Sequence, residues 1–242
     1  MENNSQQRAW EREYQDPGFI SMDTEPQQEI KRFLKWLKKE GSIHYGYNIL
    51  QDPHHDRPVI LDLGCGTGRN LIYPAKQYGT KGYGYDFSQT AISQARRNAL
   101  GMPLIFDVRS IGEEYPLEDQ SVDIVFDITA SHALYEGERN VYLREVKRVL
   151  KPNGLFVVRT LCLDSDKNAK NLIKMFAGPE PDTYILPEQD MMEKVFSEKT
   201  FRELYEKDFE ILEFQKPSGY QRWGSQSFKR RYIVAYMKKR TS

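Results

Sequence analysis

Residues 59–68, VILDLGCGTG, constrain the fold most, because they predict a buried strand that leads into a glycine turn and then a helix. Apolar residues around Asp62 suit a strand covered on both faces. The glycines of the turn permit positive φ and close approach of a ligand to the backbone; they are Gly64, Gly66 and Gly68. A dinucleotide-binding turn has the pattern G-x-G-x-x-G, but Arg69 or Leu71 stands where its third glycine belongs. The turn therefore favours a small-molecule cofactor other than a dinucleotide.

This run resembles the first motif of the class I S-adenosylmethionine-dependent methyltransferases. Four later segments are similar to the family's next motifs in the same order: 81–86, 104–108, 116–127 and 148–158. The spacing between Gly64 and Asp86 suits one strand–helix–strand unit. The resemblance implies methyl transfer with S-adenosylmethionine as cofactor. It also implies an α/β fold with a doubly wound, seven-stranded, mostly parallel sheet.

The resemblance also assigns roles at the cofactor site. Asp86 is expected to bind the ribose hydroxyls, Asp107 the adenine amino group, and Val108 the adenine ring. Backbone N–H groups of Gly64 and Gly66 are expected near the methionyl carboxylate, and the positive end of the helix that starts near Gly68 is expected to face the same anion. The complete set of expected cofactor residues is Asp62, Gly64, Cys65, Gly66, Gly68, Asp86, Phe87, Asp107, Val108 and Asp127, with Trp10 and Tyr14 from an N-terminal arm folded across the site.

Three residues near the end of the fourth strand are candidates for catalysis: Asp127, His132 and Tyr135. Relatives that methylate base amines carry Asn-Pro-Pro-Tyr or Asp-Pro-Pro-Tyr here, whereas this chain reads Asp127-Ile-Thr-Ala130. The difference disfavours that substrate class, and DNA is not expected as a substrate. Histidine titrates in the range that a general base needs, but a loop histidine is also commonly structural or solvated.

The cysteines and the paired histidines predict no metal site. Cys65 and Cys162 are too few for a disulfide framework or a zinc site. Cys162 lacks the accompanying Pro-Cys of RNA cytosine-5 methyltransferases. His54 and His55 are adjacent, and not four residues apart on a helix, so they do not have metal-ligand spacing.

Length and composition suit one α/β domain with additions. The 242 residues have balanced charge, which argues against a nucleic-acid grip over the whole surface. No apolar run reaches membrane-spanning length and the N-terminal residues are polar, so we expect a cytoplasmic protein with no membrane partner. Residues 1–57 form an expected arm and helix, and residues 58–242 the methyltransferase domain.

Apolar periodicity predicts the remaining elements. Residues 1–24 show no strong period. A helix is expected from Pro26 to Gly41, packed against the sheet edge, because Ile30, Phe33 and Leu34 begin an apolar stripe. Alternation of strands and helices then predicts a parallel sheet with helices on both faces. The expected strands are 58–63, 81–86, 103–107, 121–128, 154–161, 209–215 and 230–238, and the expected helices are 68–78, 89–100, 137–150, 170–176 and 198–206.

Residues 163–197 form an insert after the fifth strand. The insert leaves the sheet at the carboxyl ends of the strands, where ligands bind in this type of fold. We interpret it as a lid or substrate-recognition element, with a plain surface excursion as the alternative.

The C-terminal residues 216–242 are basic and aromatic, with no acidic residue. Their basic residues are Lys216, Arg222, Lys229, Arg230, Arg231, Lys238, Lys239 and Arg240, and their aromatic residues are Tyr220, Trp223, Phe228, Tyr232 and Tyr236. Such a mixture could stack bases and neutralise phosphates, or it could form a closing β-hairpin with solvated charges.

Three hypotheses for function follow. The first is methylation of a small metabolite by in-line displacement in a lidded pocket. The second is methylation of RNA or protein guided by the C-terminal hairpin. The third is a non-catalytic protein that binds S-adenosylmethionine as a sensor or partner subunit.

Overall fold

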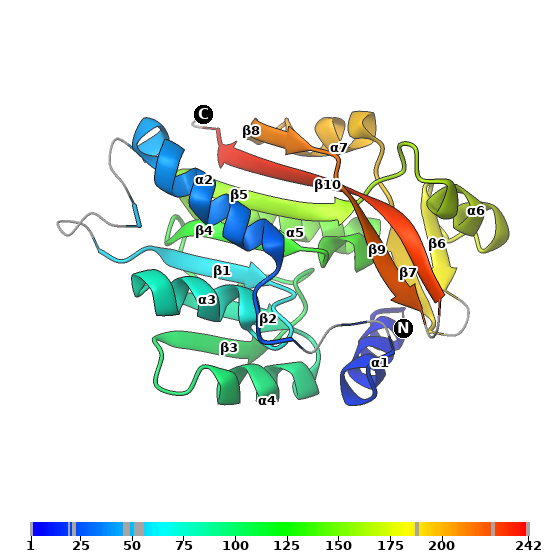
Figure 1. Ribbon diagram of the computed structural model, residues 1–242, viewed down its shortest axis with the longest axis horizontal. Coiled ribbons are helices and arrows are strands. Elements are labelled where there is room, and N and C mark those ends of the chain that lie inside the picture. Colours follow the sequence, from blue (N-terminus) through cyan, green and yellow to red (C-terminus); the bar gives the residue numbers. More distant parts are fainter. Residues whose placement is uncertain are drawn as a thin grey trace.

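The computed structural model contains one large central sheet and a small two-stranded sheet (Figure 1). The residues that the structure describes are 2–18, 20, 23–45, 49–50, 56–186, 189–223 and 226–240. His54 and His55 lie outside these residues. No described helix has the length and apolar character needed to cross a membrane.

The central sheet is doubly wound, as predicted. Its strands are β1 (Val59–Leu63), β2 (Lys81–Asp86), β3 (Leu104–Val108), β4 (Val122–Ile128), β5 (Leu150–Leu161), β8 (Phe209–Gln215), β9 (Ser218–Trp223) and β10 (Gln226–Lys239). The order is β3-β2-β1-β4-β5-β10-β8, with β1 to β5 parallel and β10 antiparallel to both neighbours. The predicted seven strands form this path, and β9 adds an eighth by pairing with the first half of β10.

Helices cover both faces of the sheet. The described helices are α1 (Glu2–Gln15), α2 (Gln28–Tyr45), α3 (Arg69–Tyr78), α4 (Gln89–Asn98), η1 (Ser131–Ala133), α5 (Glu136–Val149), α6 (Lys167–Met175) and α7 (Glu198–Tyr205). Neighbouring β1 residues enter different cores: Ile60 packs with α2, α3 and α4, and Leu61 with α5 and α7. All seven β4 residues are buried, as expected for a central parallel strand.

The predictions for α2 were wrong at two points. The helix crosses the face of the sheet above β4, β5 and β10, and not its edge (Figure 1). Phe33 packs edge-to-face on Phe126 and Tyr236, with ring centroids 5.8 and 5.1 Å away. The helix also continues through Gly41 to Tyr45. A single glycine costs a helix only about 1 kcal/mol, so it does not by itself end one.

Helix α1 was not predicted as a regular element. Its buried positions, Gln6, Ala9 and Glu13, follow helical spacing, but two of the three are polar. An apolar stripe is therefore missing from the sequence. The Glu13 carboxylate instead accepts hydrogen bonds from the backbone N–H groups of Gly18 and Ile20, which fixes the turn after the helix.

The insert contains α6 and an antiparallel hairpin of β6 (Thr183–Leu186) and β7 (Met191–Lys194). Tyr184 is fully buried in a separate apolar cluster with Ala9 of α1 and Tyr232 of β10. At its end, Phe196 bridges to Cys162 and belongs to the main core. The insert is thus built into the protein at both its hairpin and its last residues.

The C-terminal segment forms the hairpin β9–β10, but its charges are not all solvated as one interpretation supposed. Arg230 is only 3% exposed. Its guanidinium Nη2 donates to the Tyr184 hydroxyl at 2.7 Å, and its Nε lies 3.5 Å from the Asp166 carboxylate. The reason is that β10 packs against the insert, whose Asp166, Tyr184 and Glu193 surround this side chain.

Candidate functional site

The glycine turn after β1 has the backbone geometry that the sequence predicted. Gly64, Gly66 and Gly68 have φ values of 70°, 53° and 81°. A Cβ atom on Gly64 would lie 2.3 Å from the Ala130 Cβ, and one on Gly66 would lie 2.6 Å from the Tyr14 hydroxyl. The turn therefore requires glycine both for its φ values and for its close neighbours.

The N–H groups of the turn do not point where we expected. Those of Gly64 and Cys65 donate to the Tyr85 carbonyl at 2.8 and 3.0 Å, and that of Gly66 donates to the Asp86 carboxylate at 2.9 Å. These three N–H groups therefore hydrogen-bond the end of β1 to the end of β2. The first turn of α3, which begins at Arg69, instead presents the N–H groups that a helix leaves without internal acceptors.

Asp86 ends β2 at the centre of the site. One carboxylate oxygen accepts from Gly66 N and the other from Ser88 N, each at 2.9 Å. Burial raises the pKa of this carboxyl group to about 6, although both hydrogen bonds oppose the shift. Each oxygen retains acceptor capacity, so Asp86 can bind two further donors.

Asp62 is buried directly below the turn. It is 1% exposed, and neither carboxylate oxygen has a hydrogen-bond partner among the described residues. Burial, together with the nearby charges of Asp86 and Asp127, raises the pKa of Asp62 well above its ordinary value. Buried polar groups in proteins are normally paired, so Asp62 is suited to a bound cation or donor.

Helix α1 covers this end of the sheet. The Gln7 amide donates to the Phe87 carbonyl at 3.0 Å. The Glu11 carboxylate accepts from the hydroxyls of Ser88 and Thr90, at 2.7 and 2.5 Å. These contacts fix the helix over the turn that joins β2 to α4, so its inner side chains face the site.

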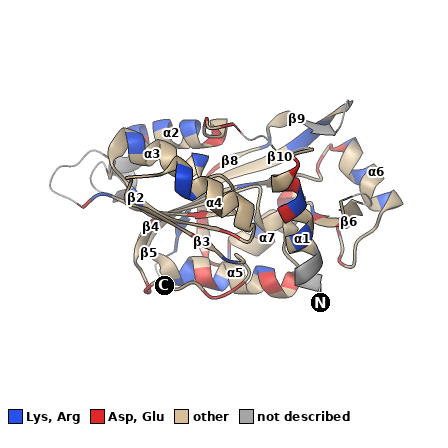
Figure 2. Cartoon of the chain, turned by 90° about the horizontal axis from the view of Figure 1, so that it is seen from below, with Lys and Arg blue, Asp and Glu red and all other residues tan. Residues whose placement is uncertain are grey.

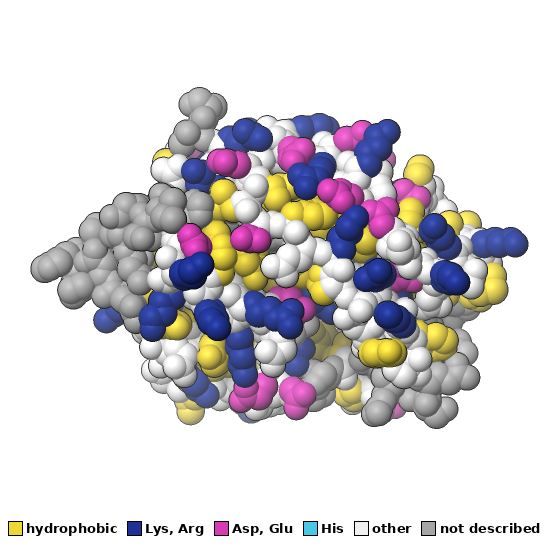
Figure 3. Space-filling model, turned by 45° about the horizontal axis from the view of Figure 1, so that its top comes forward, with side chains coloured by type: hydrophobic (Ala, Val, Ile, Leu, Met, Phe, Trp, Pro, Cys, Tyr) yellow, Lys and Arg dark blue, Asp and Glu magenta, His cyan; other side chains and the backbone are white. Residues whose placement is uncertain are grey.

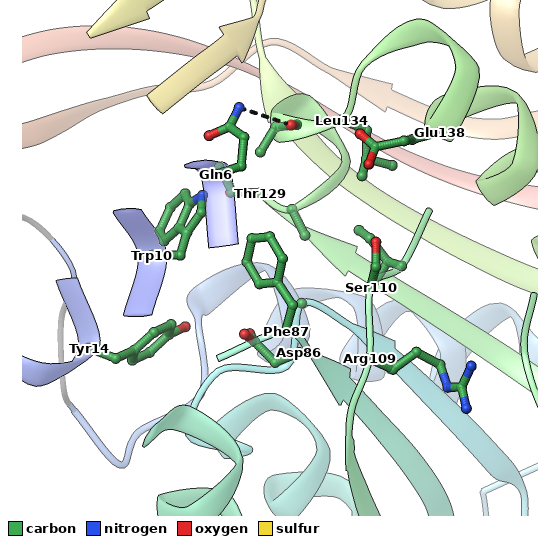
Figure 4. Close-up of a pocket in the computed structure, with 14 residues that line it drawn as sticks. Gln6, Trp10, Tyr14, Asp86, Phe87, Arg109, Ser110, Thr129, Leu134 and Glu138 are labelled. Carbon is green, nitrogen blue, oxygen red and sulfur yellow. Dashed lines mark hydrogen bonds between the residues drawn. The ribbon is translucent and has the colours of Figure 1, made fainter. Parts of the chain in front are cut away.

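Two adjoining cavities lie under α1. The first, of about 70 Å³, is lined by Asp86 (Figure 4). The second, of about 390 Å³, extends from the glycine turn toward His132. Both are lined by Trp10, Tyr14, Gly64 and Thr129. Figure 4 shows Trp10 and Tyr14 of α1 facing Asp86 and Phe87 across the first cavity.

The structure brings most of the predicted cofactor residues to these cavities. The first is lined by Gly64, Asp86 and Phe87, the second by Cys65 and Gly66. Asp62, Gly68, Asp107 and Val108 line neither cavity. Asp107 pairs with Arg96 at 3.5 Å and Val108 is 39% exposed. Residues 109–111, directly after them, line the first cavity instead.

Of the three catalytic candidates, the structure brings His132 to the site. Asp127 is fully buried, and its carboxylate accepts from the N–H groups of Ala130 and Ser131 and from the Tyr142 hydroxyl at 2.5 Å. Asp127 therefore fixes the turn after β4 and lines neither cavity. Tyr135 stands at the N-cap of α5 and also lines neither.

Sequence reasoning missed Glu193, the partner of His132. Its Oε1 lies 3.7 Å from the His132 Nε2, and both residues line the second cavity. The only signal was an acidic residue inside the largely apolar stretch 191–196. Nothing in the sequence connects that strand with His132.

The doubly wound sheet, the glycine turn and an acidic residue at the end of the next strand define a Rossmann-like methyltransferase fold. A family model described as a methyltransferase domain matches residues 60–154. A tRNA N(3)-cytidine methyltransferase of Danio rerio is 29% identical over 55% of this chain and 42% of its own length. The chain thus spans less than half of that relative.

Solved structures agree on the fold. A methyltransferase of Methanosarcina mazei superposes with a TM-score of 0.68 at 23% identity, covering 81% of this chain and 96% of that one. The Burkholderia thailandensis 1,6-didemethyltoxoflavin-N1-methyltransferase superposes with a TM-score of 0.68 at 18% identity, covering 99% of this chain and 89% of that one. That structure holds 1,6-didemethyltoxoflavin and S-adenosylhomocysteine. Residues 60–154 thus match a methyltransferase domain, and the chain has the fold of the class I S-adenosylmethionine-dependent methyltransferases, whose cofactor is S-adenosylmethionine.

The residues present fit this cofactor. S-adenosylmethionine carries an ammonium group, a carboxylate and a ribose diol. The site offers a buried carboxylate without a partner at Asp62, the N-terminus of α3 at Arg69, and spare acceptor capacity at Asp86.

Proposed function

We propose that this protein transfers the methyl group of S-adenosylmethionine to a small molecule bound in the cavity of about 390 Å³. The observation that carries the proposal is this cavity, which is lined by the cofactor turn at one end and by His132 and Glu193 at the other. Its volume lies within the size range of small-molecule sites. Its lining comes from distant parts of the chain, among them α1, the turn after β1, the ends of β4 and β5, and the hairpins β6–β7 and β9–β10. Such a chamber suits an acceptor small enough to be enclosed.

The proposed cofactor contacts are specific. Asp86 accepts the two ribose hydroxyls, Asp62 faces the ammonium group, and the first turn of α3 binds the carboxylate, because helix N-termini favour anions. Trp10 and Tyr14 close the site from above. The bound cofactor supplies an activated methyl group on a sulfonium, so the chain's main task is to align the acceptor and exclude water.

The wall near the acceptor is held under backbone strain. Thr129 has a φ of 65°, a conformation that is unusual for a β-branched residue. Its N–H donates to the Arg159 carbonyl at 2.8 Å, and its hydroxyl bonds to the Arg159 guanidinium. Strain of this kind clusters at functional sites, which supports placing the acceptor beside Thr129.

RNA is the second candidate, because a relative over 55% of this chain is named a tRNA methyltransferase. The charge distribution supports RNA as the acceptor less well than it supports a small molecule. Lys216 pairs with Glu198 at 2.8 Å and Lys238 with Glu210 at 3.7 Å, while Arg230 is buried. Outside residues 216–242, Lys and Arg are interspersed with Asp and Glu along the chain (Figure 2). Both signs of charge also occur on the face seen in Figure 3.

The proposal is tested by supplying S-adenosylmethionine with a labelled methyl group and three acceptor pools. These are a small-metabolite extract, total RNA and total protein. We expect label in the metabolite pool, together with RNA affinity that is weak at physiological salt. Label in RNA, with binding that falls steeply as salt increases, would establish the second candidate. Binding of S-adenosylhomocysteine without transfer to any pool would favour the non-catalytic hypothesis.

A further inference from the structure

His132 lies in a buried polar cluster that the cofactor site does not use. Its ring is 2% exposed and lines the acceptor cavity. Its Nε2 faces the Glu193 carboxylate at 3.7 Å, which is ion-pair range and too long for a hydrogen bond. Its Nδ1 is buried and has no hydrogen-bond partner among the described residues. One ring nitrogen thus faces a carboxylate, and the other has no hydrogen-bond partner among the described residues.

Glu193 is itself held by groups from two further strands. The Tyr184 hydroxyl on β6 donates to its Oε2, and the Arg230 guanidinium on β10 lies 3.9 Å from that oxygen. Arg230 in turn contacts Asp166. All of these residues are at least 97% buried. On the remaining side, α1 contributes the neutral Gln6, whose amide donates to the Ala133 carbonyl at 3.4 Å.

The Glu193 carboxylate is held in its charged form. Burial alone would raise its pKa, but the nearby His132 when protonated, the charge of Arg230 and the Tyr184 hydroxyl outweigh burial and lower the pKa. Arg230 and Tyr184 favour the ionised carboxylate whatever the charge of His132. An ionised carboxylate beside Nε2 favours a proton on that nitrogen. The lone pair of a neutral ring then lies on Nδ1, the nitrogen without a protein partner.

We propose that His132 is the catalytic base for an acceptor that loses a proton on methylation, and that Glu193 is the residue that positions it. The inference rests on the proposed function. It narrows the acceptor to a small molecule whose methylated atom carries an ionisable hydrogen: a hydroxyl, a thiol or a ring N–H.

The balance of the step is simple. The hydrogen on the acceptor atom passes as a proton to His132 Nδ1. The electron pair of that bond forms the new bond to the methyl carbon, and the pair of the broken carbon–sulfur bond stays on sulfur. No oxidant or reductant is required. A positioned base contributes about 10²- to 10⁴-fold in rate.

The first test reads the ring directly, by nitrogen NMR of the ¹⁵N-labelled full chain. The chain has four histidines, so His132 is assigned by the signal lost in His132→Gln. We expect a neutral ring with its proton on Nε2 and an unprotonated Nδ1. The same tautomer should persist in Glu193→Gln, whose amide oxygen still accepts, and become mixed in Glu193→Leu. Glu180→Gln, which alters a carboxylate paired with Arg139, is the matched control and should change nothing.

Two spectral results would overturn the inference: a proton on Nδ1 in the wild type, or a ring that stays doubly protonated up to pH 9. Both are read from the wild-type chain, so they hold even where Glu193→Leu fails to fold. Circular dichroism of each variant identifies that case.

The second test uses the methyl-transfer assay on the metabolite pool. We expect His132→Gln to lower the initial rate by 10²- to 10⁴-fold while S-adenosylhomocysteine affinity stays within twofold. Unchanged transfer in this variant would refute the base and leave the proposed function intact. A wild-type chain that does not bind S-adenosylhomocysteine would refute the proposed function, whatever the tautomer of His132.

Discussion

Protonation of Asp86 should weaken cofactor binding as the pH falls. Burial raises the pKa of this carboxyl group to about 6, and we propose that its ionised form accepts the ribose hydroxyls. The apparent Kd is then the intrinsic Kd divided by the ionised fraction. At pH 5 about one carboxyl group in eleven is ionised, so S-adenosylhomocysteine should bind about tenfold more weakly than at pH 8.

The direction follows from proton linkage. Without cofactor, the folded chain binds a proton at Asp86 that the unfolded chain has already released at its ordinary pKa near 4. The stability due to this group is present at low pH and is lost as the pH rises toward and through about 6. A shift of about two units corresponds to about 3 kcal/mol. Cofactor binding favours the ionised form, so it should release protons near pH 6.

Calorimetry with S-adenosylhomocysteine from pH 5 to 8, in two buffers of different ionisation enthalpy, measures both quantities. Asp86→Asn should bind about 10- to 100-fold more weakly at pH 8, because a charge-assisted bond is worth about 1.5–3 kcal/mol, and its Kd should vary little with pH. Asp107→Asn makes the same chemical change at a partly exposed site and should keep the wild-type profile. A wild-type Kd that stays constant to pH 5, or an unchanged slope in Asp86→Asn, would refute the reasoning.

Three further predictions concern stability. Arg230→Ala should cost about 3–5 kcal/mol, because it leaves buried carboxylates uncompensated, whereas Lys229→Ala on the exposed neighbour should change the free energy of unfolding by less than about 0.5 kcal/mol; urea unfolding of both variants decides. Gly66→Ala should cost about 1–2 kcal/mol for its left-handed conformation, and adding Tyr14→Phe should recover part of the loss; full stability in Gly66→Ala would contradict the geometry. Deletion of residues 163–197 should abolish cooperative thermal unfolding, because it removes core packing around Phe196; a melting transition near that of the wild type would show the insert to be a dispensable lid.

The sequence by itself determined the architecture. Strand and helix periods are local properties, so the order of β1 to β5, α7, β8 and β10 followed from apolar spacing, whereas β6, β7 and β9 were not predicted as strands. The glycine turn at 64–68 and the acidic residue at 86 located the cofactor edge, because positive φ and close backbone approach restrict the residue type at the position itself. Helix α1 was not predicted because its buried face carries Gln6 and Glu13, which give no apolar stripe in the sequence.

Only the tertiary structure decided which polar groups are available for chemistry. The N–H groups of Gly64 and Gly66 already donate hydrogen bonds to the neighbouring strand β2. The Asp127 carboxylate already accepts hydrogen bonds from its own turn and from Tyr142. Arg230 is buried and not solvated, and Glu193 reaches His132, because the insert folds back over the carboxyl ends of the strands. Burial and pairing depend on segments far apart in the chain. Sequence patterns therefore placed the site, while three-dimensional packing chose the residues that are free to act in it.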